Sequence, residues 1–165
     1  MRKLWIVTIC ILLLIMCSCA NNRGLNQNDL EFKINGKSFL LDSDVTVLLK
    51  ELGDNYELNE APSCVYEGKD KTFVYEGIEI YTYPLNDKDM IDEILLTDRT
   101  YKTNREIAVG DTKNDLIKAY GEEFIDEGGI IKYSLKPDDH GSPCLYFQLT
   151  DDKIVAISYY SASNM

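Results

Sequence analysis

The chain has 165 residues, with 28 acidic against 17 basic side chains and a formal net charge of −11 at pH 7. This balance argues against nucleic acid as a partner, because phosphate binding needs clustered Lys and Arg. It also argues against electrostatic docking on anionic lipid. We interpret the charge as a source of solubility rather than as an acidic site for a basic partner.

The first residues have the pattern of an export signal. Arg2 and Lys3 precede an almost unbroken apolar run over residues 4–16. A run of this length is too short to cross a bilayer as a permanent helix, but it suits a signal peptide. We therefore predict a lipoprotein signal peptide over residues 1–18.

The end of this run, Met16-Cys17-Ser18-Cys19, resembles a bacterial lipobox. The small Ser18 favours Cys19 as the modified residue, because Cys17 has the bulky Met16 before it. The resemblance implies cleavage before Cys19 and diacylation of its thiol. The protein is then expected on the extracytoplasmic side of the cell membrane, held by lipid. An ordinary signal peptide or an N-terminal membrane anchor are the alternatives.

A polar segment follows the modified cysteine. Residues 19–29 lack an apolar period, and we predict a flexible tether there. The folded part is then expected over residues 30–165, roughly 130 residues, which is a normal size for one domain with its own core.

Two cysteines, Cys64 and Cys144, remain after processing and lipidation. Thiols outside the cytoplasm can form a disulfide, which would be worth about 4 kcal/mol across a loop of this length. The alternative is two separate cysteines that pack as small apolar side chains. Two thiols do not make a structural zinc site, which needs four ligands.

Two stretches have the pattern of a short, capped helix. In the stretch 109–121, Asp111 or Thr112 can cap the N-terminus, and Gly121 can end the helix. The stretch 42–53 has the same design, displaced by 68 positions. Strand-like sequence follows each of them, so we predict two copies of one helix-then-sheet unit.

The strand pattern completes this prediction. Asn35-Gly36 is a strong signal for a two-residue hairpin, and the later strands are joined by short turns that favour antiparallel pairing. We predict an α+β fold with two tandem helix-plus-antiparallel-meander repeats, about 31–98 and 99–160. The helices should pack on one face of a curved antiparallel sheet.

The stretch from Gly110 to Gly121 also carries a family resemblance. Its Gly-x-Thr-x-x-x-Leu-x-x-x-Tyr-Gly pattern resembles the opening of each unit in the β-lactamase-inhibitory-protein-like group, although the first copy has Asp42 at the opening glycine. The chain is also similar to the related small lipoprotein of the outer-membrane β-barrel assembly machine and to lipoproteins of Gram-positive gut bacteria. The resemblance, over residues 34–160, implies an open sheet face opposite the helices. Inhibitor activity carries over only weakly from the resemblance, because fold does not determine function.

Catalytic signals are weak. His140 is the only histidine and lies in the turn-rich loop 138–143. It could serve as a general base or metal ligand, but a solvated loop histidine is the preferred interpretation. The acidic stretch 87–93 lacks the spacing of a calcium loop. We therefore expect no enzyme activity, no metal and no cofactor.

The stronger signal is aromatic, since 11 tyrosines occur and many lie in predicted strands. Strand alternation puts the proposed partner-binding residues on the face away from the helices: Glu79, Tyr81, Tyr83, Lys132, Tyr146 and Gln148. Tyrosine suits interfaces, although it also suits any half-buried pleated surface. We predict a membrane-anchored protein-binding module. A structural envelope component without a specific partner, or an enzyme centred on His140, are the alternatives.

Overall fold

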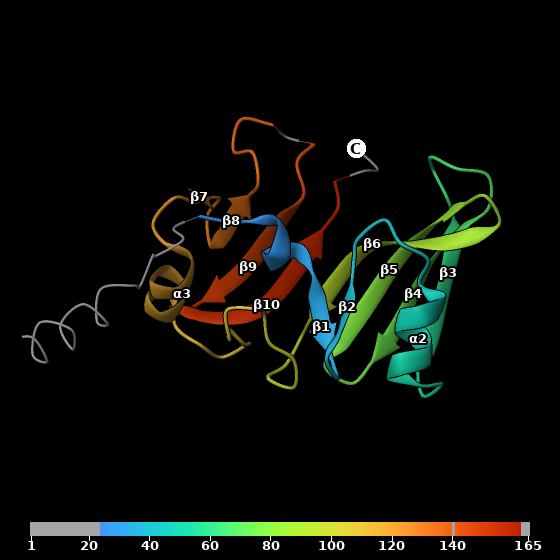
Figure 1. The fold of residues 1–165 in the computed structure, drawn as a ribbon, viewed down its shortest axis with the longest axis horizontal. Helices are drawn as coiled ribbons and strands as arrows, with labels where there is room; N and C mark the ends of the chain where they lie inside the picture. The colour runs from blue at the N-terminus through green and yellow to red at the C-terminus, as the bar shows by residue number, and fades with distance from the viewer. Residues whose placement is uncertain (1–23, 140, 163–165) are drawn as a thin grey trace, which may run out of the picture.

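The computed structural model describes residues 24–139 and 141–162 (Figure 1). The signal peptide, Cys19 and His140 lie outside the described residues. Two α-helices and one 3₁₀ helix accompany ten strands in the described part. In chain order the elements are η2 (Gln27–Leu30), β1 (Phe32–Ile34), β2 (Lys37–Phe39), α2 (Thr46–Leu52), β3 (Glu57–Pro62), β4 (Lys69–Tyr75), β5 (Ile78–Leu85), β6 (Lys88–Leu96), α3 (Lys113–Tyr120), β7 (Ile125–Asp126), β8 (Ile130–Ser134), β9 (Cys144–Thr150) and β10 (Lys153–Tyr160).

Eight of these strands form one antiparallel sheet, in the order β3-β4-β5-β6-β10-β9-β8-β7. Strands β3 to β6 and strands β7 to β10 are each joined in chain order. The two groups meet where β6 pairs with β10, with Leu96 opposite Ile157 and Ile94 opposite Tyr159. Strands β1 and β2 form a separate hairpin.

The predicted α+β class, with two helix-plus-meander repeats, is wrong. The described chain is mostly β, because α2 has only seven residues and α3 only eight. Helices of two turns do not form a layer of their own, so the eight-stranded sheet is the framework. The β1–β2 hairpin and η2 also precede only α2, and the two groups of strands differ in length.

The tight turns follow from residues that tolerate positive φ. Asn35 and Gly36 have φ of 51° and 76° between β1 and β2, which confirms that predicted hairpin. Asp151 and Asp152, with φ of 50° and 59°, likewise join β9 to β10. Short turns of this kind keep neighbouring strands antiparallel.

Helix α3 has the caps that its sequence predicts. The Thr112 hydroxyl accepts a hydrogen bond from the Asp115 backbone N–H, and the Asp115 carboxylate accepts one from the Thr112 backbone N–H. Gly121, at φ 89°, ends the helix. Leu116 and Tyr120, on the buried side of this helix, are fully buried. These caps fix where the helix contacts the sheet.

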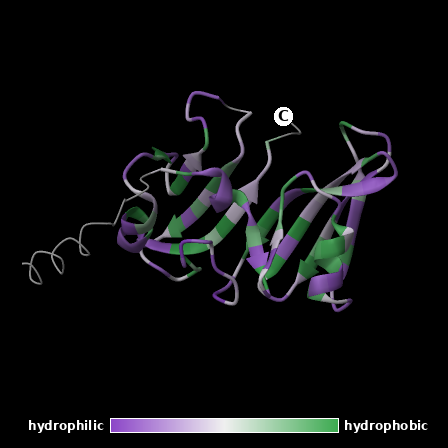
Figure 2. Ribbon diagram, in the orientation of Figure 1, coloured by the Kyte–Doolittle hydropathy of each residue, from purple (hydrophilic) through white to green (hydrophobic). Residues whose placement is uncertain are grey.

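One face of the sheet is covered. In Figure 1, α2 and α3 lie toward opposite ends of the sheet, with the β1–β2 hairpin between them. The Phe32 ring of the hairpin lies 5.9 Å from the Tyr159 ring of β10, and the Tyr120 ring of α3 lies 5.5 Å from the Phe147 ring of β9. Figure 2 shows hydrophobic and hydrophilic residues alternating along the long strands. The apolar half of this alternation forms the core with the helices and the hairpin.

The domain begins earlier than predicted. The sequence predicts a flexible tether that includes residues 24–29, yet Asp29 and Leu30 are each only 3% exposed. Arg105 fixes the segment, because its guanidinium donates to both Asp29 carboxylate oxygens and to the Gly24 carbonyl. Among residues 24–139 and 141–162, no helix is long and apolar enough to cross a membrane.

Candidate binding surface

The uncovered face of the sheet is built from two rows of paired residues. The first row crosses all eight strands and consists of Glu57, Val74, Glu79, Leu95, Ser158, Tyr146, Lys132 and Ile125. The second row consists of Asn59, Thr72, Tyr81, Glu93, Tyr160, Cys144 and Ser134. We call these two rows, with Gln148 and Tyr83 beside them, the open face. In the part of the chain that the structure describes, both α-helices and the β1–β2 hairpin pack on the other side.

Four of the predicted contact residues reach solvent on this face. Gln148 is exposed, while Glu79, Tyr81 and Tyr146 are half-buried. The Tyr81 hydroxyl donates a 2.6 Å hydrogen bond to Glu79. Burial raises the pKa of Tyr81 and of Tyr146, so both hydroxyls stay protonated at neutral pH. The rings therefore present neutral, partly wetted surfaces on a rigid sheet.

Tyr83 and Lys132 do not fit the prediction of exposed contact residues. Tyr83 is 6% exposed, because the loop between β3 and β4 folds over it and the Tyr66 ring stacks on its ring at 5.1 Å. Lys132 is 9% exposed, and its Nζ lies 5.4 Å from the centre of the Tyr146 ring. Both side chains therefore pack against neighbouring rings and offer little exposed area to a partner.

The possible disulfide is not formed in this structure. Cys64 is an exposed free thiol in the β3–β4 loop, whereas Cys144 is a buried free thiol on β9. The strands β5, β6 and β10 lie between β4 and β9 in the sheet, which separates the two residues. Burial raises the pKa of the Cys144 thiol, which keeps it protonated and unreactive.

The centre of the open face holds a carboxylate with an unfavourable environment. Burial, together with the carboxylates of Asp92 and Glu79, raises the pKa of Glu93, although the hydrogen bond from the Ser158 hydroxyl acts in the opposite direction. The folded state therefore binds a proton at pH values where the unfolded chain has lost it. Stability contributed by this group falls as pH rises through that window, above about 4.5.

Glu93→Gln is expected to raise the free energy of unfolding at pH 7 and to flatten its pH dependence above the ordinary carboxylate range. The reason is that the amide keeps the shape of the side chain but carries no buried charge. Urea unfolding at pH 5 and pH 7 measures both effects. The exposed Glu122 supplies the control, because Glu122→Gln should change neither value.

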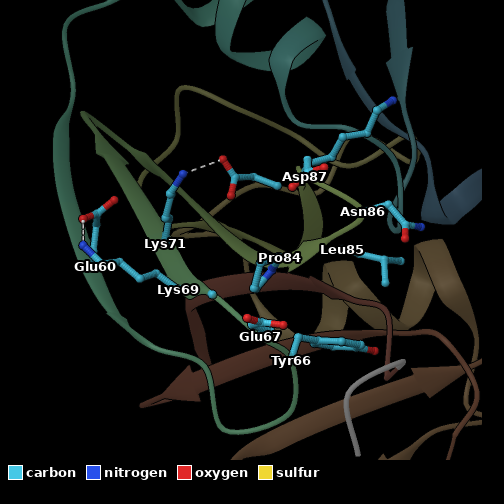
Figure 3. Close-up of a pocket in the computed structure, with 12 residues that line it drawn as sticks. Glu60, Tyr66, Glu67, Lys69, Lys71, Pro84, Leu85, Asn86 and Asp87 are labelled. Carbon is cyan, nitrogen blue, oxygen red and sulfur yellow. Dashed lines mark hydrogen bonds and ion pairs between the residues drawn. The ribbon is translucent and has the colours of Figure 1, made fainter.

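A groove of about 750 Å³ lies at the end of the sheet between the β3–β4 loop and the β5–β6 turn (Figure 3). Its three lysines are already paired: Lys69 with Glu60 at 2.8 Å, Lys71 with Asp89 at 2.8 Å, and Lys88 with Asp44 at 3.2 Å. Because each ammonium has a carboxylate beside it, the groove offers no concentrated charge for a phosphate or carboxylate ligand.

The described residues do not include a metal-binding cluster. No group of three or more His, Cys, Asp or Glu side chains there is arranged to hold a metal ion. The predicted absence of catalysis, metal and cofactor stays a prediction, because His140 lies outside this part of the chain.

No family model and no curated protein match the chain. Among solved structures, it is similar to the uncharacterized protein yfeY from Escherichia coli, with a TM-score of 0.43 and 12% sequence identity. The similarity covers 73% of this chain and 92% of that chain. A likeness of this strength supports no conclusion about function.

Sequence reasoning missed two central residues of the open face, Glu93 and Tyr160. Strand β6 contains a bulge at Asp92, since Tyr81 pairs with Glu93 and Thr82 with Ile91. Alternation read from Ile91 therefore places Glu93 on the wrong face. The position of Tyr160 could have been predicted, because Ile157 and Tyr159 mark the buried face of β10 and strand alternation then places Tyr160 on the opposite face.

Proposed function

We propose that this protein is a lipid-anchored, extracytoplasmic binding module whose open face binds a partner protein. The observation that carries the proposal is the contrast between the two faces of the sheet. One face is covered by α2, α3 and the β1–β2 hairpin, and its central residues, such as Ile80, Ile94 and Ile157, are fully buried. The other holds half-buried tyrosines on three of its strands, Tyr81 on β5, Tyr146 on β9 and Tyr160 on β10.

Tyrosines in this setting suit recognition. The Tyr146 and Tyr160 rings lie 6.0 Å apart on β9 and β10, and Tyr81 lies on the same register row as Tyr160. A tyrosine on a strand loses little conformational entropy when a partner docks, and it offers both a large apolar area and a hydroxyl group. A surface of this kind gains more from docking than from contact with water.

The carboxylates on the face define the partner further. Glu79 and Glu93 lie near its centre, and the Nζ of Lys132 lies 5.4 Å from the centre of the Tyr146 ring. A partner should therefore present hydrogen-bond donors or basic groups opposite this centre. Charge complementarity of this kind selects partners and speeds association more than it adds affinity.

The anchoring part of the proposal predicts that Cys19→Ala releases the protein from the membrane or blocks its processing. The thiol of Cys19 is the expected site of diacylation, since Ser18 precedes it after the apolar run. Cell fractionation and intact mass of the purified protein measure the effect. Cys17→Ala is the matched control and should keep both anchoring and the diacyl mass. Diacylated, membrane-bound Cys19→Ala protein would contradict the assignment.

The binding part predicts that Tyr81→Ala and Tyr146→Ala each weaken binding to the partner by about 1–2 kcal/mol, as expected for interface anchors. The loss follows from the apolar area that each ring contributes. Isothermal titration with the partner measures it, and circular dichroism checks that the variants stay folded. Val47→Ala, at a 62% exposed position on α2, is the control and should bind normally. Unchanged affinity in both folded tyrosine variants would exclude the open face.

A further inference from the structure

A small cavity opens where the open face meets the β3–β4 loop. It measures about 260 Å³ and lies beside the groove of Figure 3, with which it shares Tyr66 and Lys71. We call it the tyrosine pocket. Its aromatic and acidic lining consists of Tyr66, Tyr81, Tyr83, Asp70 and Asp92.

The loop that forms one wall of this pocket is held in place. The Ser63 backbone N–H donates to the Gly68 carbonyl at 3.1 Å, and the Ser63 hydroxyl accepts from the backbone N–H groups of Val65 and Tyr66. A Cβ added at Gly68 would lie 3.0 Å from the Pro84 side chain, so the loop approaches β5 closely. The Tyr66 ring therefore has a fixed position opposite the strands.

An acidic oxygen in the wall has unmet hydrogen-bonding capacity. Asp70 Oδ1 is buried and accepts no hydrogen bond from any of the residues that the structure describes. The lysine in the lining, Lys71, donates to Asp89 at 2.8 Å. A carboxylate with a buried oxygen that lacks a donor is costly, so Asp70 favours a hydrogen-bond donor or a cation in the pocket beside it.

We propose that the tyrosine pocket binds an organic cation, an alkylammonium or guanidinium group, beside Asp70 and against the tyrosine rings that line the pocket. Aromatic faces attract such cations, and the carboxylate supplies a charge-assisted hydrogen bond. The volume is below the roughly 300–1,000 Å³ of drug-sized ligand sites, so one side-chain terminus or a small amine fits. We identify the cation as a lysine or arginine side chain of the partner protein, which inserts into the pocket when the partner binds the open face. This identification rests on the proposed function.

Titration of the full chain in detergent micelles, with the tyrosine rings ¹³C-labelled for NMR, tests the pocket directly. Butylammonium and methylguanidinium are the cationic probes, and butanol is the neutral control of similar shape. We expect saturable shifts of Tyr66, Tyr81 and Tyr83 with the cations only. Equal shifts with butanol, or no saturable response to either cation, would overturn the proposal.

Variants identify the groups responsible. Asp70→Asn and Tyr66→Leu should each weaken cation binding by about tenfold, through loss of the ion pair or of one ring. Asp138→Asn, at an exposed position outside the pocket, is the matched control and should bind normally. Undiminished binding in folded Asp70→Asn would overturn the assignment of the carboxylate.

A further comparison separates the two sources of the cation. N-acetyl-lysine-methylamide should bind more tightly than butylammonium if a partner side chain is the ligand, since its backbone adds contacts at the mouth. Tighter binding of the free amine would overturn the partner side chain as the source while leaving the pocket chemistry supported. Neither result depends on Tyr146, so failure of the pocket and failure of the open face as a docking surface are distinguishable.

Discussion

Arg105→Met is expected to lower the free energy of unfolding by about 3–5 kcal/mol, the usual effect of breaking a buried ion pair by removing one partner. The Arg105 side chain is 15% exposed and that of Asp29 is 5% exposed. The Arg105 Nε lies 2.9 Å from Asp29 Oδ1, and its Nη2 lies 2.6 Å from Oδ2. The variant would leave the Asp29 carboxylate buried without this cation.

The same guanidinium joins three parts of the chain. It donates to the Gly24 carbonyl at 2.7 Å and to the Ala119 carbonyl near the end of α3 at 2.8 Å, and it lies 4.6 Å from the centre of the Tyr120 ring. Its loss should therefore free residues 24–30 from the domain as well as reduce stability. Faster proteolysis in this segment would accompany the change.

Urea unfolding of the chain from residue 20 measures the effect of Arg105→Met. Arg99→Met is the control, because the Arg99 side chain is 64% exposed and its ion pair with Asp111 should contribute no more than about 1 kcal/mol. Equal costs for the two variants would show that burial of the Arg105–Asp29 pair has no special importance.

The second large effect is expected in the helices. Leu48→Ala in α2 and Leu116→Ala in α3 should each cost about 2–5 kcal/mol, because both side chains are fully buried and truncation leaves a cavity. Val47→Ala, in the same helix as Leu48 but on its exposed side, should cost well under 1 kcal/mol after allowance for helix propensity. Denaturant midpoints of the three variants provide the measurement. Midpoints unchanged by Leu48→Ala and Leu116→Ala would mean that neither helix is anchored to the sheet.

Local features of the fold were predictable because they depend on neighbouring residues. Asn35-Gly36 specifies its hairpin through positive φ, and Thr112 with Asp115 caps α3 within one turn. The fold class was not predictable in the same way. Recognition of two capped helices suggested an α+β architecture, but the helices are too short to change a mostly β framework.

The parts that sequence reasoning missed depend on contacts between distant residues. Arg105 and Asp29 are 76 positions apart, so the ion pair that holds residues 24–29 on the domain has no signal in the local sequence. The burial of Tyr83 depends on the loop that carries Tyr66, whose position over the sheet has no signal in strand alternation. The bulge at Asp92 hid Glu93 for a related reason, since a bulge is defined by both strands of a pair.

Site-specific photocrosslinking in cells tests the central claim, that the open face binds a partner protein. A photoreactive residue in place of Gln148 lies on β9 at an exposed position of the open face, and the same residue in place of Val47 lies on the outer side of α2. The account predicts a discrete crosslinked protein from position 148, absent from position 47 and reduced when Tyr146→Ala is added. Identical crosslinking patterns from both positions, or none from position 148 in correctly anchored protein, would contradict it.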